Sequence, residues 1–151
     1  MKALIVYDSV YGNTEKVARA IGEAMTPSGE VKVLRAGDTN SSELASVGLL
    51  IVGSPVHGGR PTPAVQDFLN KMAQQSLKGI KVTTFDTRAT SKFAKIFGNA
   101  AGRIAGQLTK KGGVLVVPPE GFFVTGTKGP LKEGELERAA AWAKGILEGK
   151  K

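Results

Sequence analysis

Residues 8–14 carry the residue types in this chain that are best suited to bind an anion. The segment is Asp-Ser-Val-Tyr-Gly-Asn-Thr, and it lies between an apolar run and a helical pattern. Hydroxyl and amide side chains, a glycine and the amino end of a helix together favour a phosphate. The segment lacks the Gly-Lys-Ser/Thr ending of a nucleotide-hydrolase P-loop and the spacing G-x-G-x-x-G. It therefore predicts a monoester phosphate on a larger ligand; the alternative is that these side chains only cap the helix.

Two further segments follow other apolar runs and have unusual compositions. Residues 53–63 contain the only histidine, His57, followed by Gly58 and Gly59 between flanking prolines. Residues 87–92 are polar except for one alanine. In an open parallel sheet, ligands bind beyond the carboxyl ends of the strands. We therefore expect the three segments to surround one site.

Short apolar runs alternate with amphipathic segments along the whole chain. The predicted strands are residues 3–7, 31–35, 48–53, 80–86 and 113–117. Nearly continuous apolar runs are typical of strands that are covered on both faces. Regular alternation of strand and helix predicts an α/β fold, a three-layer α/β/α sandwich around a five-stranded parallel sheet. The length predicts one domain over residues 1–151.

Three of the predicted helices have apolar residues at helical spacing, and the first of them carries Val17 and Ile21. Another carries Val65, Phe68, Leu69 and Met72. The last carries Leu136, Ala140, Ala143 and Leu147. This spacing places each set on one face, which we expect to be buried. Trp142 is interpreted as part of that packing, and the segment after Asn40 shows only a weak helical pattern.

The composition excludes several classes of protein. The chain has 151 residues, with 21 Lys and Arg, 13 Asp and Glu, one His and no Cys, which gives a net charge of +8. Without cysteine there is no disulfide, thiolate nucleophile or iron–sulfur cluster, and we expect no metal site. No apolar run approaches the roughly 20 residues of a membrane helix, so we expect a cytoplasmic protein without a membrane partner. The basic residues are spread along the chain rather than gathered in a stripe with aromatic residues, which argues against nucleic-acid binding.

The segment Ser-Val-Tyr-Gly-Asn-Thr at residues 9–14 resembles the phosphate loop of flavodoxins. The resemblance extends over essentially the whole chain, including Gly-Ser-Pro-Val-His-Gly-Gly-Arg-Pro-Thr-Pro at residues 53–63 and the segment 121–138 before the last helix. It implies the flavodoxin-like strand order 2-1-3-4-5. It also implies FMN as the cofactor, a flavin that ends in one phosphate and so agrees with the first loop.

The resemblance further implies which residues bind FMN. The phosphate would be held by Ser9, Val10, Tyr11, Gly12, Asn13 and Thr14. One face of the flavin ring would contact Pro55, Val56, His57, Gly58 and Gly59. The other face would contact Thr87, Arg88, Thr90, Ser91 and Lys92. Asp86, just before this third loop, is interpreted as a cap for its own loop, with a hydrogen bond to the flavin as the alternative.

The function implied by the resemblance is electron transfer between redox partner proteins, with no catalytic residue assigned. In flavodoxins a peptide of the second loop turns on reduction so that a carbonyl accepts a hydrogen bond from the flavin, and Gly58-Gly59 would permit this turn. The charge of +8 predicts a partner with an acidic face. The alternatives are an FMN-dependent NAD(P)H:quinone or flavin reductase, and a flavin-free binding module of the same fold.

Overall fold

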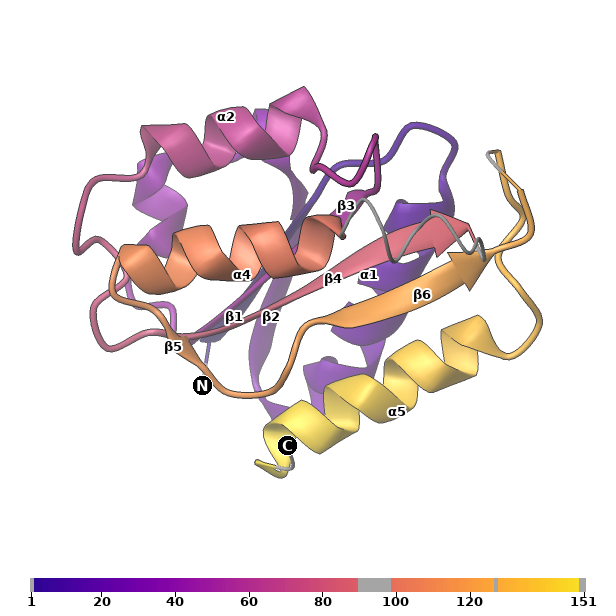
Figure 1. Cartoon of the computed structure of the whole chain (residues 1–151). Coiled ribbons are helices and arrows are strands. Elements are labelled where there is room, and N and C mark those ends of the chain that lie inside the picture. The colour runs from indigo at the N-terminus through magenta and orange to yellow at the C-terminus, as the bar shows by residue number, and fades with distance from the viewer. Residues whose placement is uncertain (1, 90–98, 127, 150–151) are drawn as a thin grey trace.

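A computed structural model describes residues 2–89, 99–126 and 128–149 of the chain. Its centre is a parallel sheet with helices on both faces (Figure 1). The strands are β1 (Lys2–Tyr7), β2 (Glu30–Arg35), β3 (Leu49–Pro55), β4 (Lys81–Ala89), β5 (Val114–Leu115) and β6 (Glu120–Val124). The helices are α1 (Asn13–Met25), α2 (Pro63–Lys71), α4 (Ala100–Lys110) and α5 (Glu135–Leu147). The order β2-β1-β3-β4-β5 confirms the predicted topology and the three-layer α/β sandwich.

The central strands are buried on both faces, as their continuous apolar runs predict. In β1, Ile5 packs into a core cluster with residues of α1 and α5, whereas its neighbour Leu4 packs into a second cluster with residues of α2 and α4. Both side chains are fully buried. Successive side chains of a strand point to opposite faces, so one apolar strand supplies both cores.

The edge of the sheet beyond β4 differs from the prediction of one strand at residues 113–117. β5 covers only Val114–Leu115 and pairs with Lys81 and Val82, and β6 then pairs with Phe85–Ala89 farther along β4. Pro118 and Pro119 lie between the two segments and have no N–H to donate to a strand ladder. As a result, a strand that the sequence pattern did not predict reaches the carboxyl end of the sheet.

The helix patterns are confirmed in α2 and shifted in α5. Val65, Phe68 and Leu69 of α2 are all buried. In α5 the predicted Ala143 is buried and Leu147 packs against the core, but Leu136 is 40% exposed and Ala139 and Ile146 are buried, so the prediction is wrong at Leu136. Glu135, the neighbour of Leu136, is buried, and its carboxylate accepts a hydrogen bond from the N–H of Phe123 at 2.7 Å.

Aromatic packing joins α5 to the sheet. The ring of Trp142 meets Phe85 and Phe122 edge to face, with centroids 6.3 and 5.8 Å apart. Such pairs stabilise a core beyond the area that they bury. The predicted packing role of Trp142 is confirmed. The weak pattern after Asn40 is a short 3-10 helix, Ser41–Leu44. None of the helices in the described part of the chain has the length and apolar composition of a membrane-spanning segment.

Candidate functional site

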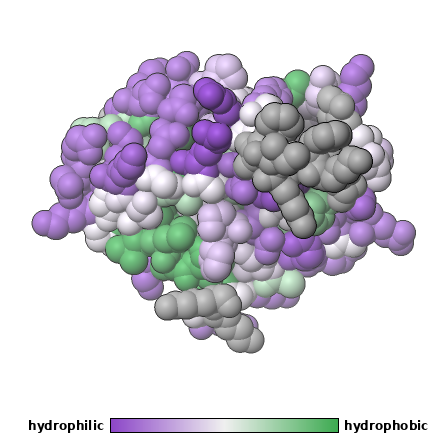
Figure 2. Space-filling model, in the orientation of Figure 1, coloured by the Kyte–Doolittle hydropathy of each residue, from purple (hydrophilic) through white to green (hydrophobic). Residues whose placement is uncertain are grey.

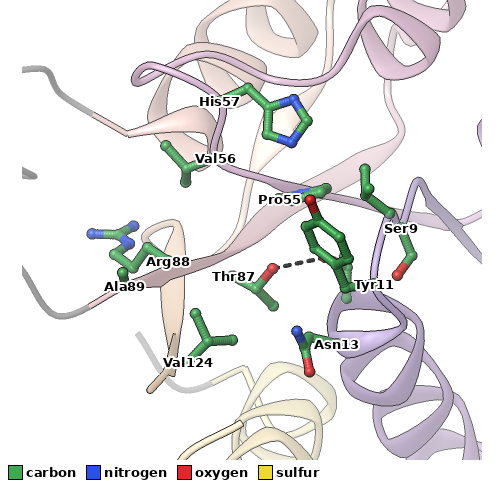
Figure 3. Close-up of a pocket in the computed structure, with 12 residues that line it drawn as sticks. Ser9, Tyr11, Asn13, Pro55, Val56, His57, Thr87, Arg88, Ala89 and Val124 are labelled. Atoms are coloured by element: carbon green, nitrogen blue, oxygen red, sulfur yellow. Dashed lines mark hydrogen bonds between the residues drawn. The ribbon is translucent and has the colours of Figure 1, made fainter. Parts of the chain in front are cut away.

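A pocket lies at the carboxyl ends of β1, β3 and β4, the edge of the sheet where the sequence predicted a site (Figure 3). It is lined by Ser9, Val10, Tyr11, Asn13, Thr14, Pro55, Val56, His57, Thr87, Arg88, Ala89 and Val124. Three loops that are far apart in the sequence therefore meet there, because parallel strands end at the same edge of the sheet.

The loop between β1 and α1 leaves the amino end of α1 without a side-chain cap. Gly12 precedes the helix with a φ of 92°, a left-handed conformation that glycine adopts at little cost. Its N–H donates to the hydroxyl of Ser9 at 3.0 Å, which holds the turn in shape. The first N–H groups of a helix have no intrahelical partner, so those of α1 are available to an anion. The side chains of the loop therefore do not cap the helix, which was the alternative interpretation.

Two buried hydroxyls join the first loop to the end of β4. The Oγ1 atoms of Thr14 and Thr87 lie 2.7 Å apart, and the residues are 1% and 5% exposed. Either oxygen can be the donor. Whichever donates, the other hydroxyl keeps its own hydrogen, because a hydroxyl both donates and accepts. The pair therefore retains one donor for a ligand oxygen in the pocket.

The side chain of Asn13 fixes a neighbouring loop instead of pointing freely into the pocket. Its Nδ2 donates to the carbonyl of Lys128 at 3.2 Å. A Cβ on Gly129, which has a φ of 95°, would come within 2.5 Å of the Asn13 amide. Only a residue without a side chain fits this approach. The loop after β6 is thereby held against the amino end of α1.

The second loop forms a tight hairpin. His57 and Arg60 exchange both backbone hydrogen bonds, at 2.9 and 3.0 Å. The two residues between them, Gly58 and Gly59, have φ values of 59° and 78°. A two-residue connection with positive φ at both positions is a type I′ turn. His57 at its base is exposed and borders the pocket, as does Tyr11 from the first loop, which is 50% exposed (Figure 3).

Buried Asp86 forms an ion pair with the partly exposed Arg88 beside the pocket. The guanidinium donates to the two carboxylate oxygens at 2.7 and 2.9 Å. One of these oxygens also accepts the N–H of Ala101 at 2.9 Å, in the first turn of α4. Burial raises the pKa of Asp86, against the lowering effect of Arg88. Asp86 therefore joins β4 to the first turn of α4, at the two ends of the loop that it was predicted to cap.

The structure brings most of the predicted site residues to this pocket. Gly12, Gly58 and Gly59 shape its loops but do not line it. Thr90, Ser91 and Lys92 lie outside the described residues. Ala89 and Val124 line the pocket and were not predicted. Ala89 continues β4 beyond the predicted end of the strand. Val124 belongs to β6 and pairs with Ala89 of β4. This pairing was not predicted, because no pattern in the sequence shows which residues of the two strands lie side by side.

Comparisons with known proteins identify relatives of this chain. The model of a family described as "Flavodoxin domain" matches residues 4–112. The flavodoxin of Megasphaera elsdenii is 37% identical over 84 residues, 54% of this chain and 61% of that protein. The coenzyme F420H(2) oxidase of Methanothermobacter marburgensis is 28% identical over 130 residues, 82% of this chain but 31% of that protein. The chain spans between 19% and 61% of the length of the curated relatives that it matches.

A solved structure matches the fold over its full length. The crystal structure of oxidised flavodoxin 2 from Bacillus cereus has a TM-score of 0.81 with this chain. The two are 25% identical, and the match covers 98% of this chain and 99% of that one. The sheet, the flanking helices and the loops at the carboxyl ends of the strands thus follow an arrangement that is already known.

Proposed function

This chain belongs to the flavodoxin family, and we propose on that basis that its three loops bind FMN and that it carries electrons between redox proteins. FMN is the cofactor of this family. The observation that carries the proposal is the uncapped amino end of α1, which opens into the same pocket as the hydroxyl pair of Thr14 and Thr87.

The pocket has the donors that a phosphate monoester requires. Backbone N–H groups of the first turn of α1 are without side-chain acceptors, and the helix dipole favours negative charge there. The hydroxyls of Thr14 and Thr87 add a donor from a second element. The phosphate would be held by Ser9, Val10, Tyr11, Gly12, Asn13 and Thr14. The side chains of Ser9, Asn13 and Thr14 form hydrogen bonds that hold the backbone of this loop, whose N–H groups would donate to the phosphate.

The walls of the pocket suit a flat ring. Pro55, Val56 and His57 form one side, and Tyr11 from the first loop adds an aromatic side chain. Thr87 and Arg88 would contact the other side of the ring, together with Thr90, Ser91 and Lys92. Bound FMN would supply one- and two-electron redox chemistry, and the protein would hold and orient it.

The hairpin at residues 57–60 gives the protein a means to respond to the charge and protonation of the cofactor. In a type I′ turn the peptide between Gly58 and Gly59 can rotate to give a type II′ turn while both His57–Arg60 hydrogen bonds persist. The rotated turn requires at position 58 a backbone conformation that only glycine adopts readily. We expect the rotation to present the Gly58 carbonyl as a hydrogen-bond acceptor to the reduced cofactor.

The partner of this electron carrier would be a protein with an acidic face. The net charge of +8 favours association with an acidic surface and makes the association rate fall as salt rises. The similarity to the coenzyme F420H(2) oxidase supports a redox role, although the match covers only 31% of that protein.

An electron-transfer assay with NADH and NADPH separates a carrier from the reductase alternative. The FMN-loaded protein is expected not to oxidise either nucleotide in the presence of a quinone. After chemical reduction it is expected to reduce a second redox protein within milliseconds to seconds. Rapid nucleotide oxidation would identify a reductase, and protein that stays colourless with FMN would identify a flavin-free module.

A further inference from the structure

A second pocket lies between α2 and α4, beside the hairpin of the first. Its volume is about 300 Å³, and it is lined by Arg60, Pro61, Pro63, Gln66, Arg103 and Gln107. Two of the lining residues are arginines, and none is acidic. Figure 2 shows hydrophilic side chains gathered over α2 and α4 on this face of the molecule.

The two arginines of this pocket differ from the others in the chain. Of the six arginines, the other four pair with carboxylates: Arg19 and Arg35 with Glu15, Arg88 with Asp86, and Arg138 with Glu135. Neither Arg60 nor Arg103 has a salt-bridge partner among the described residues, and the remaining positions, 1, 90–98, 127, 150 and 151, include no Asp or Glu. The unpaired guanidinium groups therefore share one pocket.

The backbone that carries the two arginines is held in place. Gln66 of α2 and Gln107 of α4 exchange two amide hydrogen bonds, at 2.8 and 3.1 Å, which tie the helices together below the pocket. Arg60 closes the hairpin through its two backbone bonds to His57. The spacing between the arginines is thus set by the fold, and ordering them for a partner costs little beyond their side-chain rotamers.

The local field favours a negative group in this pocket. α2 and α4 both follow strands of a parallel sheet, so both begin at its carboxyl end, and their positive ends face the same way. Arg103 lies in the first turn of α4, where a cation is disfavoured. A carboxylate that binds the two guanidinium groups would relieve this repulsion and form charge-assisted, bidentate hydrogen bonds.

We propose that the pocket between α2 and α4 is the docking site for acidic side chains of the redox partner protein. The inference rests on the proposed function and names the contact that orients the partner. Arg60 belongs to the hairpin that also carries His57, so a carboxylate bound at Arg60 places the partner surface at the edge of the cofactor pocket. Charge complementarity at such a contact sets the orientation of the complex and speeds its formation.

A fluorescein-labelled hexaglutamate peptide tests the site through its Kd, measured by fluorescence anisotropy at low salt. The double variant Arg60→Gln and Arg103→Gln is expected to weaken binding about tenfold or more, because both partners of the carboxylates are lost. The matched control is Lys71→Gln with Lys110→Gln, which removes two charges from the last turns of the same helices. We expect this control to change the Kd less than about threefold. Circular dichroism confirms that each variant folds.

Equal weakening by the two double variants would overturn the proposal, because net charge alone would then explain binding. Displacement of the peptide by inorganic phosphate as readily as by unlabelled hexaglutamate would also overturn it, in favour of a small-anion site. The peptide titration is made with and without FMN. If the native protein bound the peptide but did not bind FMN, the proposed function would be contradicted and the docking site would not.

Discussion

The hydroxyl oxygens of Thr14 and Thr87 lie 2.7 Å apart, although the residues are 73 positions apart in the chain. This contact connects the amino end of α1 to the carboxyl end of β4. It assembles donors from two elements on one side of the pocket and excludes water from between them. The contact is the structural basis for expecting a phosphate there.

Substituting valine for either threonine tests the phosphate site. Thr14→Val and Thr87→Val each remove a hydroxyl while keeping the shape of the side chain. We expect the Kd for FMN to rise about tenfold, the effect of losing roughly 1.4 kcal/mol of hydrogen bonding to a charged group. Riboflavin has no phosphate, so its Kd is expected to stay the same for Thr14→Val, whereas Thr87→Val is expected to weaken riboflavin as well, because Thr87 would also contact the ring. Fluorescence titration with both flavins measures the effect.

Thr109→Val is the control for this pair, because its hydroxyl is on the exposed face of α4 and bonds only to the carbonyl of Gly106. If Thr14→Val raised the Kd of FMN and that of riboflavin by the same factor, the hydroxyl would act at the ring or in the loop structure. This result would contradict the phosphate assignment.

Alanine at the two hairpin glycines is expected to shift the first reduction potential of bound FMN in opposite directions. Gly58→Ala penalises the rotated turn, and a Cβ there meets nothing within 4 Å in the present turn. A penalty of about 1–3 kcal/mol lowers the potential by roughly 40–130 mV. Gly59→Ala disfavours the present turn, with its φ of 78°, and is expected to raise the potential. Spectroelectrochemical titration gives both values, and shifts of the same sign would contradict peptide rotation.

The pH dependence of stability is expected to show the buried carboxylate of Asp86. Burial raises its pKa in the folded state, so its contribution to stability is present below its unfolded pKa and is lost as pH rises through the folded pKa. The free energy of unfolding of the native protein, relative to Asp86→Asn, is therefore expected to fall as pH rises above the ordinary pKa of an aspartate, about 3.9. Urea denaturation at several pH values measures this difference.

Glu135 provides the opposite case in the same experiment. Its pKa is lowered, chiefly by the hydrogen bond from Arg138, so its contribution is present at neutral pH and is lost as pH falls. The free energy of unfolding of the native protein, relative to Glu135→Gln, is expected to fall toward low pH.

The outcome that would contradict the expectation for Asp86 is the opposite trend. If the free energy of unfolding of the native protein, relative to Asp86→Asn, grew with pH, the ion pair with Arg88 would outweigh the burial of the carboxylate.

Two buried threonines predict contrasting stability changes. The hydroxyl of Thr62 is buried and has no hydrogen-bond partner among the described residues. Thr62→Val is expected to be neutral or to stabilise by up to about 1 kcal/mol, because an unpartnered polar group is removed. The hydroxyl of Thr84 donates to the carbonyl of Ala101 at 2.7 Å, so Thr84→Val is expected to cost about 1 kcal/mol. Thermal denaturation of both variants compares them, and a larger loss for Thr62→Val would contradict the assignment.

Much of the fold follows from local sequence patterns. The apolar runs that became β1, β3 and β4 are buried on both faces, and continuous runs of this kind predict central parallel strands, whereas β2 lies at the edge of the sheet and is only partly buried. The site loops were predictable because ligands bind where such strands end. The division of the edge strand into β5 and β6 was not predicted. It depends on which residues beyond Pro118 and Pro119 find partners on β4, and this is a tertiary choice.

The shifted face of α5 has a similar origin. The spacing of Leu136, Ala140, Ala143 and Leu147 was compatible with a buried stripe, but Leu136 is exposed and its neighbour Glu135 is buried, where it accepts a hydrogen bond from the backbone of Phe123. The contact between Thr14 and Thr87 also depends on long-range placement. Periodicity identifies the elements, whereas polar contacts between distant residues fix their final orientation.

A fluorescence titration of FMN with the purified apoprotein tests whether the three loops bind this cofactor through its phosphate. Bound FMN is expected to lose fluorescence at a stoichiometry of one per chain, and riboflavin to bind at least about tenfold more weakly, because it lacks the phosphate that α1, Thr14 and Thr87 would hold. Flavin fluorescence that stays unchanged up to millimolar protein, or equal affinity for FMN and riboflavin, would contradict the account.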